Sequence, residues 1–211
     1  MKGAITVKLI AIIGTTASGK DTIVRELLKR NNKLKKIVSV TNRPMRQGEI
    51  HGKDYNFVTD KEMKALINEN KLIERRDYKT KNGVWTYGTE KSSIDINSDN
   101  IYIHIVDWNG FEALIDYIWF CLGGVEGKQI NLDDYIKGYC IDADVDIRLE
   151  RYRKRNSDTY EMCRRILADK EQIEDIYDDL YKDDISKLEN NNKVDFEIAI
   201  NKILEDLKKW N

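Results

Sequence analysis

The opening of the chain most constrains its fold, because an apolar run leads through a glycine-bounded loop into a helix. Val7 to Ile13 are almost all apolar, which is typical of a central strand in a parallel sheet. After the loop, Ile23, Leu27 and Leu28 have helical spacing within Lys20 to Arg30. The order strand, loop, helix predicts the first unit of an α/β fold.

Later parts of the chain repeat the strand signal, with helical stretches between most of the strands. The expected strands are Ile37 to Val40, Ile101 to Val106, Tyr139 to Ile141 and Val194 to Ile200, and a long helical pattern runs from the end of an arginine-rich stretch to about Leu188. Strands that alternate with helices predict a parallel sheet covered by helices on both faces.

Length and composition limit the class of protein. A chain of 211 residues suits one domain with small inserted lobes. The 36 Lys and Arg against 37 Asp and Glu lack the basic excess of a protein held by nucleic acid, so no nucleic-acid partner is expected. No stretch approaches the roughly 18 to 20 apolar residues of a membrane span.

The cysteines favour a reducing compartment. Three cysteines without paired spacing, accompanied by two histidines, support neither a disulfide framework nor a zinc site. The expected location is therefore the cytoplasm. The sequence does not indicate an oligomeric state.

The loop after the first strand has the spacing of a phosphate-binding loop. Its residues are Gly14, Thr15, Thr16, Ala17, Ser18, Gly19, Lys20, Asp21 and Thr22. Glycines let backbone amides wrap a phosphate, the helix adds its positive end, and Lys20 can bridge the β and γ phosphates of ATP. The final position usually holds Ser or Thr, so Mg²⁺ would be held by Asp21, by Thr22 or through water. The alternative is a plain glycine turn between strand and helix.

The segment from Thr41 to about Ser93 differs in composition, being rich in Arg, Lys, Gly and Tyr, and is interpreted as an inserted lobe. Within it, Thr59 and Glu62 have the spacing of a capping box at a helix start. The predicted helix continues to Asn70.

The motifs of this lobe resemble those of a known family. The residues are Ser39-Val40-Thr41-Asn42-Arg43-Pro44-Met45-Arg46-Gln47-Gly48-Glu49, Gly52-Lys53-Asp54-Tyr55-Asn56-Phe57-Val58, Glu74 and Tyr87-Gly88-Thr89, and they are similar to the GMP-binding lobe of guanylate kinases. The resemblance implies a P-loop nucleoside monophosphate kinase of one domain, with a core (1–40, 94–147 and 166–211), an NMP-binding lobe (41–93) and an arginine-rich lid (148–165). It implies phosphorylation of GMP or dGMP by ATP with Mg²⁺.

The lobe has candidates for holding the acceptor phosphate. Arg43 and Arg46 flank a proline and can grip one phosphate with fork-shaped donors. Tyr55 and Tyr87 can add hydroxyl donors to the same group. The alternatives are solvated surface charges for the arginines and core positions for the tyrosines.

Glu74 is the candidate for reading the base. Guanine carries two donors, N1–H and the 2-amino group, and one carboxylate can accept both, whereas adenine does not offer that pair. By resemblance, Ser39 and Thr89 approach the acceptor side of guanine, and Asp107 lies near the base or the incoming phosphate. The alternative for Glu74 is a surface ion pair with Arg75 or Arg76.

The stretch 148–165 is crowded with arginines and is similar to the lid of the same family. The resemblance favours Arg151, Arg155 and Arg165 as the catalytic arginines beside Lys20. A closing arginine lid would neutralise the moving phosphoryl group and exclude water. The alternative is a solvated helix face.

Two other functions share part of this pattern. A related small-molecule kinase, such as a ribose-bisphosphate kinase or another nucleoside monophosphate kinase, could carry a Gly-Lys-Asp loop on the same fold. A guanylate-kinase-like binding domain without catalysis would tolerate loss of the loop lysine and the lid charges. Lys20 and the arginines are present, which favours the enzyme.

Overall fold

A computed structural model of the protein describes residues 5–80, 83–125, 129–154, 162–169 and 185–210. The strands are β1 Lys8–Gly14, β2 Leu34–Lys36, β3 Val40–Thr41, β4 Asn56–Phe57, β5 Leu72–Thr80, β6 Gly83–Glu90, β7 Ile101–Ile105, β8 Ile136–Asp142 and β9 Ile185–Glu189. The helices are α1 Lys20–Arg30, α2 Asp60–Asn68, α3 Trp108–Cys121, α4 Val145–Arg153 and α6 Lys193–Lys209, and residues 162–169 are also helical.

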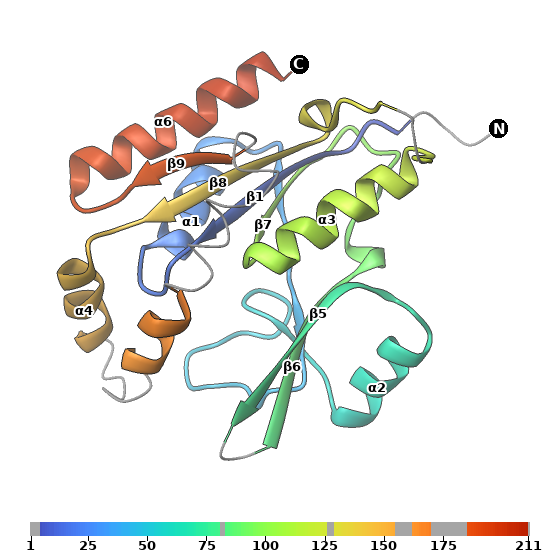
Figure 1. Cartoon of the computed structure of the whole chain (residues 1–211), viewed down its shortest axis with the longest axis horizontal. Coiled ribbons are helices and arrows are strands. Elements are labelled where there is room, and N and C mark those ends of the chain that lie inside the picture. The colour runs from blue at the N-terminus through green and yellow to red at the C-terminus, as the bar shows by residue number, and fades with distance from the viewer. Residues whose placement is uncertain (1–4, 81–82, 126–128, 155–161, 170–184, 211) are drawn as a thin grey trace.

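The larger sheet is parallel, with strand order β2-β7-β1-β8-β9, and β1 lies at its centre (Figure 1). Alternate β1 residues point to opposite faces. Leu9, Ala11 and Ile13 pack in the apolar cluster that contains α3 side chains, while Ile10 and Ile12 pack with α1 and α6. The near-continuous apolar run is thereby explained, and the α/β fold with a parallel sheet flanked by helices is confirmed.

The parallel register brings the carboxyl ends of the strands to one edge of this sheet. Gly14 pairs with Ile141, and the next residue of β8 is Asp142. Asp142 pairs in turn with Glu189 at the end of β9, so Asn190 leaves the sheet at the same edge. The loop after β1 therefore lies beside residues far away in sequence.

The inserted segment forms a second, four-stranded sheet of order β4-β3-β6-β5, beside helix α2. Its largest part is the long β5–β6 hairpin, which spans the stretch between Glu74 and Tyr87. The capping box at the start of α2 is confirmed, since Thr59 accepts from the Glu62 amide and Glu62 accepts from the Thr59 amide. The helix ends at Asn68, before Asn70 adopts a positive φ of 51°.

Two strand predictions were wrong. Ile37 to Val40 is not one strand: the chain completes β2 at Lys36 and enters the second sheet with β3 at Val40. Val194 to Ile200 lies in α6, although its residues alternate between apolar and polar. Asn192 caps that helix, and the buried Ala199, Ile200, Ile203 and Leu207 have helical spacing. The last strand of the sheet is β9, so the helical pattern predicted to reach Leu188 also ends too late.

Within the described parts of the chain, no helix combines the length and the apolar character needed to cross a bilayer.

Candidate functional site

The loop after β1 has the backbone shape that phosphate binding requires. Gly14 and Gly19 have positive φ values of 138° and 100°, and a Cβ would collide with the Ile141 carbonyl at Gly14 and with the Asn190 side chain at Gly19. Lys20 begins α1, and its Nζ donates to the carbonyls of Gly14 and Thr15 at 2.7 Å each. The lysine thus lies across the mouth of the loop. Burial lowers its pKa, an effect that Asp169 and Asp21 oppose.

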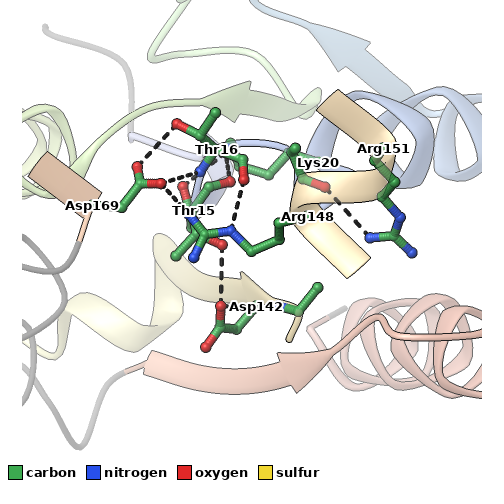
Figure 2. A network of polar contacts seen from close by, with 10 residues as sticks. Thr15, Thr16, Lys20, Asp142, Arg148, Arg151 and Asp169 are labelled. Carbon is green, nitrogen blue, oxygen red and sulfur yellow. Dashed lines mark hydrogen bonds and ion pairs between the residues drawn. The ribbon is translucent and has the colours of Figure 1, made fainter. Parts of the chain in front are cut away.

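An internal carboxylate occupies part of the loop (Figure 2). Asp169, in the helical segment 162–169, accepts from the Thr16 amide at 2.8 Å and from the Thr16 hydroxyl at 3.1 Å. It also forms an ion pair with the buried Arg148, whose Nε donates to the Thr16 carbonyl at 2.8 Å. The Thr15 hydroxyl donates to Asp142 at 3.1 Å. A backbone donor of the loop is therefore already paired with a negative charge.

Arg151 is the predicted lid arginine that the structure brings to the loop. Its guanidinium donates to the Ser18 carbonyl at 3.1 Å and to the Asn190 carbonyl at 2.7 Å. Asn190 donates to the same Ser18 carbonyl at 2.6 Å, so both side chains fix the loop backbone. Arg155 lies outside the described residues. Arg165 lies in the segment 162–169 and is half-buried.

Asp21 and Thr22, the candidate metal ligands, are exposed on the first turn of α1. Among the described residues, no group of three or more His, Cys, Asp or Glu side chains could hold a metal ion. One carboxylate or hydroxyl at a phosphate loop is the kind of donor set that Mg²⁺ uses, because this ion keeps several waters and takes other oxygens from the phosphates. The residues present therefore fit Mg²⁺ bound together with a nucleotide.

The second sheet gathers the predicted phosphate-binding groups around Arg43. Its Nε donates to the Tyr87 hydroxyl at 2.9 Å, and its two Nη atoms donate to Glu49 at 3.0 and 2.8 Å. The guanidinium carbon Cζ of Arg43 lies over the Tyr55 ring, 5.3 Å from the ring centroid. Tyr55 also contacts the Tyr87 ring edge to face. The side chain of Arg46 is exposed. Glu49 thus holds the fork of Arg43 as a phosphate would.

Glu74 lies at the other end of the same sheet face, with its side chain only 4% exposed. Its Oε1 accepts from the Thr89 hydroxyl at 2.7 Å, and Thr89 is also 2.7 Å from Nε2 of the buried His104 on β7. Its Oε2 accepts from Arg76 Nε at 3.1 Å. The ion pair with Arg76, expected at the surface as the alternative for Glu74, exists but is buried.

Asp107 and Ser39 are the remaining residues that were predicted to lie near the base. Asp107 caps α3 by accepting from the Gly110 amide at 2.9 Å, and its other oxygen is 3.1 Å from Nη1 of Arg76. Ser39, just before β3, is buried. The Thr89 hydroxyl, predicted to approach the base, is directed to Glu74 and His104 in this structure.

The phosphate loop and the lobe lie close enough to interact electrostatically. Burial raises the pKa of the Tyr55 hydroxyl, and the charge of Asp21 adds to that rise while Arg43 opposes it. A charge on the first turn of α1 therefore acts on Tyr55, one of the predicted phosphate-binding residues around Arg43.

Sequence reasoning missed several residues of the site. Asp169 contacts Thr16 across 153 positions, and no local pattern indicates such a contact. Glu49 contacts Arg43 from a loop, and Asn190 contacts the Ser18 carbonyl from a distant part of the chain, so neither contact follows from a local pattern. Arg76 was not missed, because an ion pair with Arg75 or Arg76 was the alternative given for Glu74, and residues two apart on a strand share a face.

Comparisons with known proteins agree on one family. The sequence model described as Guanylate kinase matches residues 6–116. The guanylate kinase of Rickettsia prowazekii (strain Madrid E) is 31% identical over 157 residues, covering 72% of this chain and 70% of the relative. The guanylate kinase of Zymomonas mobilis subsp. mobilis is 28% identical over 168 residues, covering 76% and 67%.

A solved structure supports the fold over nearly the whole chain. The crystal structure of guanylate kinase from Anaplasma phagocytophilum has a TM-score of 0.63 and 19% identity, and it covers 97% of this chain and 86% of that one. Because the family model spans about half of the chain and the Rickettsia relative is matched over more than two thirds of both sequences, this protein belongs to the guanylate kinase family.

Proposed function

We propose that this chain transfers the γ-phosphoryl group of ATP to GMP or dGMP, giving GDP or dGDP. The observation that carries the proposal is the buried carboxylate of Glu74 on the sheet face that also carries the Arg43 group. Guanine has two adjacent donors that one carboxylate can accept, and the 5′ phosphate suits the Arg43 fork. A base that cannot offer this pair of donors to Glu74 would be rejected by up to roughly 10⁴-fold.

The donor side relies on the loop after β1. Backbone amides of Gly14 to Asp21 and the positive end of α1 suit the phosphates of ATP. Lys20 leaves the Gly14 and Thr15 carbonyls to contact the β and γ phosphates. When bound, Mg²⁺ neutralises part of the phosphate charge, and Asp21 or Thr22 would hold it.

The chemistry needs alignment and charge neutralisation more than a strong base. A phosphate oxygen of GMP forms a bond to the γ phosphorus, and the bond from that phosphorus to the β–γ bridging oxygen breaks, so ADP leaves. The attacking group is already an anion and gives up no proton. Lys20 and the arginines of the proposed lid, Arg151, Arg155 and Arg165, stabilise the charge that spreads over the transferred group.

The expected setting follows from the sequence. The three cysteines are free thiols, as is usual for proteins of a reducing compartment, and we place the enzyme in the cytoplasm. Its partners are the nucleotides, with neither nucleic acid nor membrane. The division into core, lobe (41–93) and lid (148–165) is part of the same proposal.

A coupled assay for ADP release tests the proposal with GMP, dGMP, AMP, CMP, UMP and dTMP in turn. We expect turnover with GMP or dGMP and none above background with the others. Turnover with another nucleotide or with a sugar phosphate alone would favour a related small-molecule kinase. Calorimetric binding of GMP without any turnover would favour the non-catalytic binding domain.

A further inference from the structure

Arg76 occupies an unexpected place in the proposed base pocket. It follows Glu74 by two residues on β5, so both side chains lie on the same sheet face, and it pairs across the hairpin with Tyr87 of the Arg43 group. Its side chain is 19% exposed. Arg76 therefore lies between the base end and the phosphate end of the acceptor site.

One guanidinium bridges two carboxylates that come from different elements. Nε of Arg76 is 3.1 Å from Glu74 Oε2, and Nη2 is 3.5 Å from Oε1. Nη1 is 3.1 Å from Oδ2 of Asp107, which belongs to the core and caps α3. The side chain thus crosses from the carboxylate on the lobe to the carboxylate on the core.

Both carboxylate oxygens of Glu74 already accept hydrogen bonds from the protein. Its Oε1 already accepts the Thr89 hydroxyl, and its fork-shaped edge faces the fork of Arg76. N1–H and the 2-amino group of guanine would approach that same edge, because a pair of parallel donors needs both carboxylate oxygens. The guanidinium and the base therefore compete for one group.

We propose that Arg76 is a specificity-determining residue that pairs with the base-reading carboxylate of Glu74 and must be displaced from it when GMP binds. This inference rests on the function proposed above. Asp107 holds Nη1, so the guanidinium can turn away from Glu74 while one ion pair is kept. Displacement exchanges a charged donor for neutral ones, which lowers the affinity for the base.

The charge of Arg76 persists in this position. Burial by itself lowers the pKa of a guanidinium, but Glu74 and Asp107 outweigh it, so the pKa of Arg76 lies above its usual value. A neutral base must therefore replace a full ion pair. A base with two well-placed donors does this better than hypoxanthine, which has one on that edge, or adenine.

Arg76→Ala tests the inference, with Arg75→Ala as the matched control. Arg75 is the neighbouring residue on the same strand, points to the other face and is 49% exposed. Wild-type turnover with GMP is measured first, because its absence would defeat the proposed function and not this inference alone. We then expect Arg76→Ala to lower the KM and the calorimetric Kd for GMP on the order of tenfold. Arg75→Ala should leave both unchanged.

A ligand without a base separates competition from a general change of the site. Ribose 5-phosphate reaches the Arg43 group but not Glu74, so its inhibition constant should be the same in wild type and Arg76→Ala. Weaker or unchanged GMP binding in an active Arg76→Ala enzyme would overturn the inference. If Arg76→Ala does not fold, as judged by thermal unfolding, Arg76→Gln takes its place, because its single neutral amide should still tighten GMP binding by a smaller factor.

Discussion

The phosphate loop and the acceptor lobe are both proposed to bind a phosphate, the loop mainly with backbone groups and the lobe mainly with side chains. The loop follows the central strand of a parallel sheet and offers backbone amides whose positions are fixed by Gly14, Gly19 and contacts from Arg151 and Asn190. The lobe is a small sheet whose side chains are the proposed binding groups. The loop therefore depends on backbone shape, whereas the lobe depends on which side chains share a face.

In both regions a proposed binding group is paired with a residue of the protein itself. Asp169 pairs with the loop, Glu49 with Arg43, and Arg76 with Glu74. Buried charges are costly without partners, so each binding group keeps one until a ligand replaces it. The ligand is thus bound by exchange of partners, and each partner is a point where affinity can be changed.

The largest effect is expected at the loop. Lys20→Ala should lower turnover with ATP and GMP at least about a hundredfold, because the moving phosphoryl group loses its nearest fixed positive charge. The protein should stay folded, since the hydrogen bonds of the lysine side chain go to two carbonyls of its own loop. Steady-state ADP release measures the effect. Lys29→Ala on the exposed side of the same helix is the control, and full activity in Lys20→Ala would refute the role of the lysine.

A smaller loss is expected in the lobe. Glu74→Gln keeps the size of the side chain but replaces one acceptor oxygen by a donor group, so guanine can no longer place both donors. We expect kcat/KM for GMP to fall on the order of 30-fold, mainly through KM, and the preference for GMP over IMP to shrink. The competing result is an unchanged preference, which would mean that another group reads the base.

Removing the charge of Asp169, the carboxylate that pairs with the loop, should strengthen ATP binding, whereas the two substitutions above should lower activity. Asp169→Asn removes the negative charge beside Thr16 and keeps the side-chain volume, so the phosphates of ATP no longer meet a like charge. We expect the Kd for ATP, measured by calorimetry, to fall about fivefold. Asp146→Asn, on the exposed first turn of α4, should leave it unchanged. Weaker ATP binding in Asp169→Asn would show that the carboxylate organises the loop for the nucleotide.

The sequence predicted what short-range patterns determine. The central strand, the loop and the start of α2 were recognisable because a few neighbouring residues define each of them. The last strand was misplaced because Val194 to Ile200 alternates like a strand, whereas the helical spacing of Ile200, Ile203 and Leu207 becomes clear only over the longer segment. The contact of Asp169 with Thr16 and the ion pair of Arg76 with Asp107 depend on tertiary placement, which a single sequence does not display.

An effect on stability, and not on activity, is expected where the two regions meet, at His104 of β7, which contacts Thr89 of the lobe. Burial, helped by the charges of Arg76 and Lys36, lowers the pKa of His104 to about 3. The ring of the folded protein is neutral, whereas the ring of the unfolded chain takes up a proton below a pH of about 6.5. The stability that the neutral ring contributes is therefore complete above that pH and is lost as the pH falls towards 3. Urea unfolding should show wild type losing about 1 kcal/mol per pH unit below pH 6 relative to His104→Gln. His51→Gln, at an exposed position, should follow wild type. Parallel pH profiles for wild type and His104→Gln would mean that the ring can take up a proton without opening the junction between core and lobe.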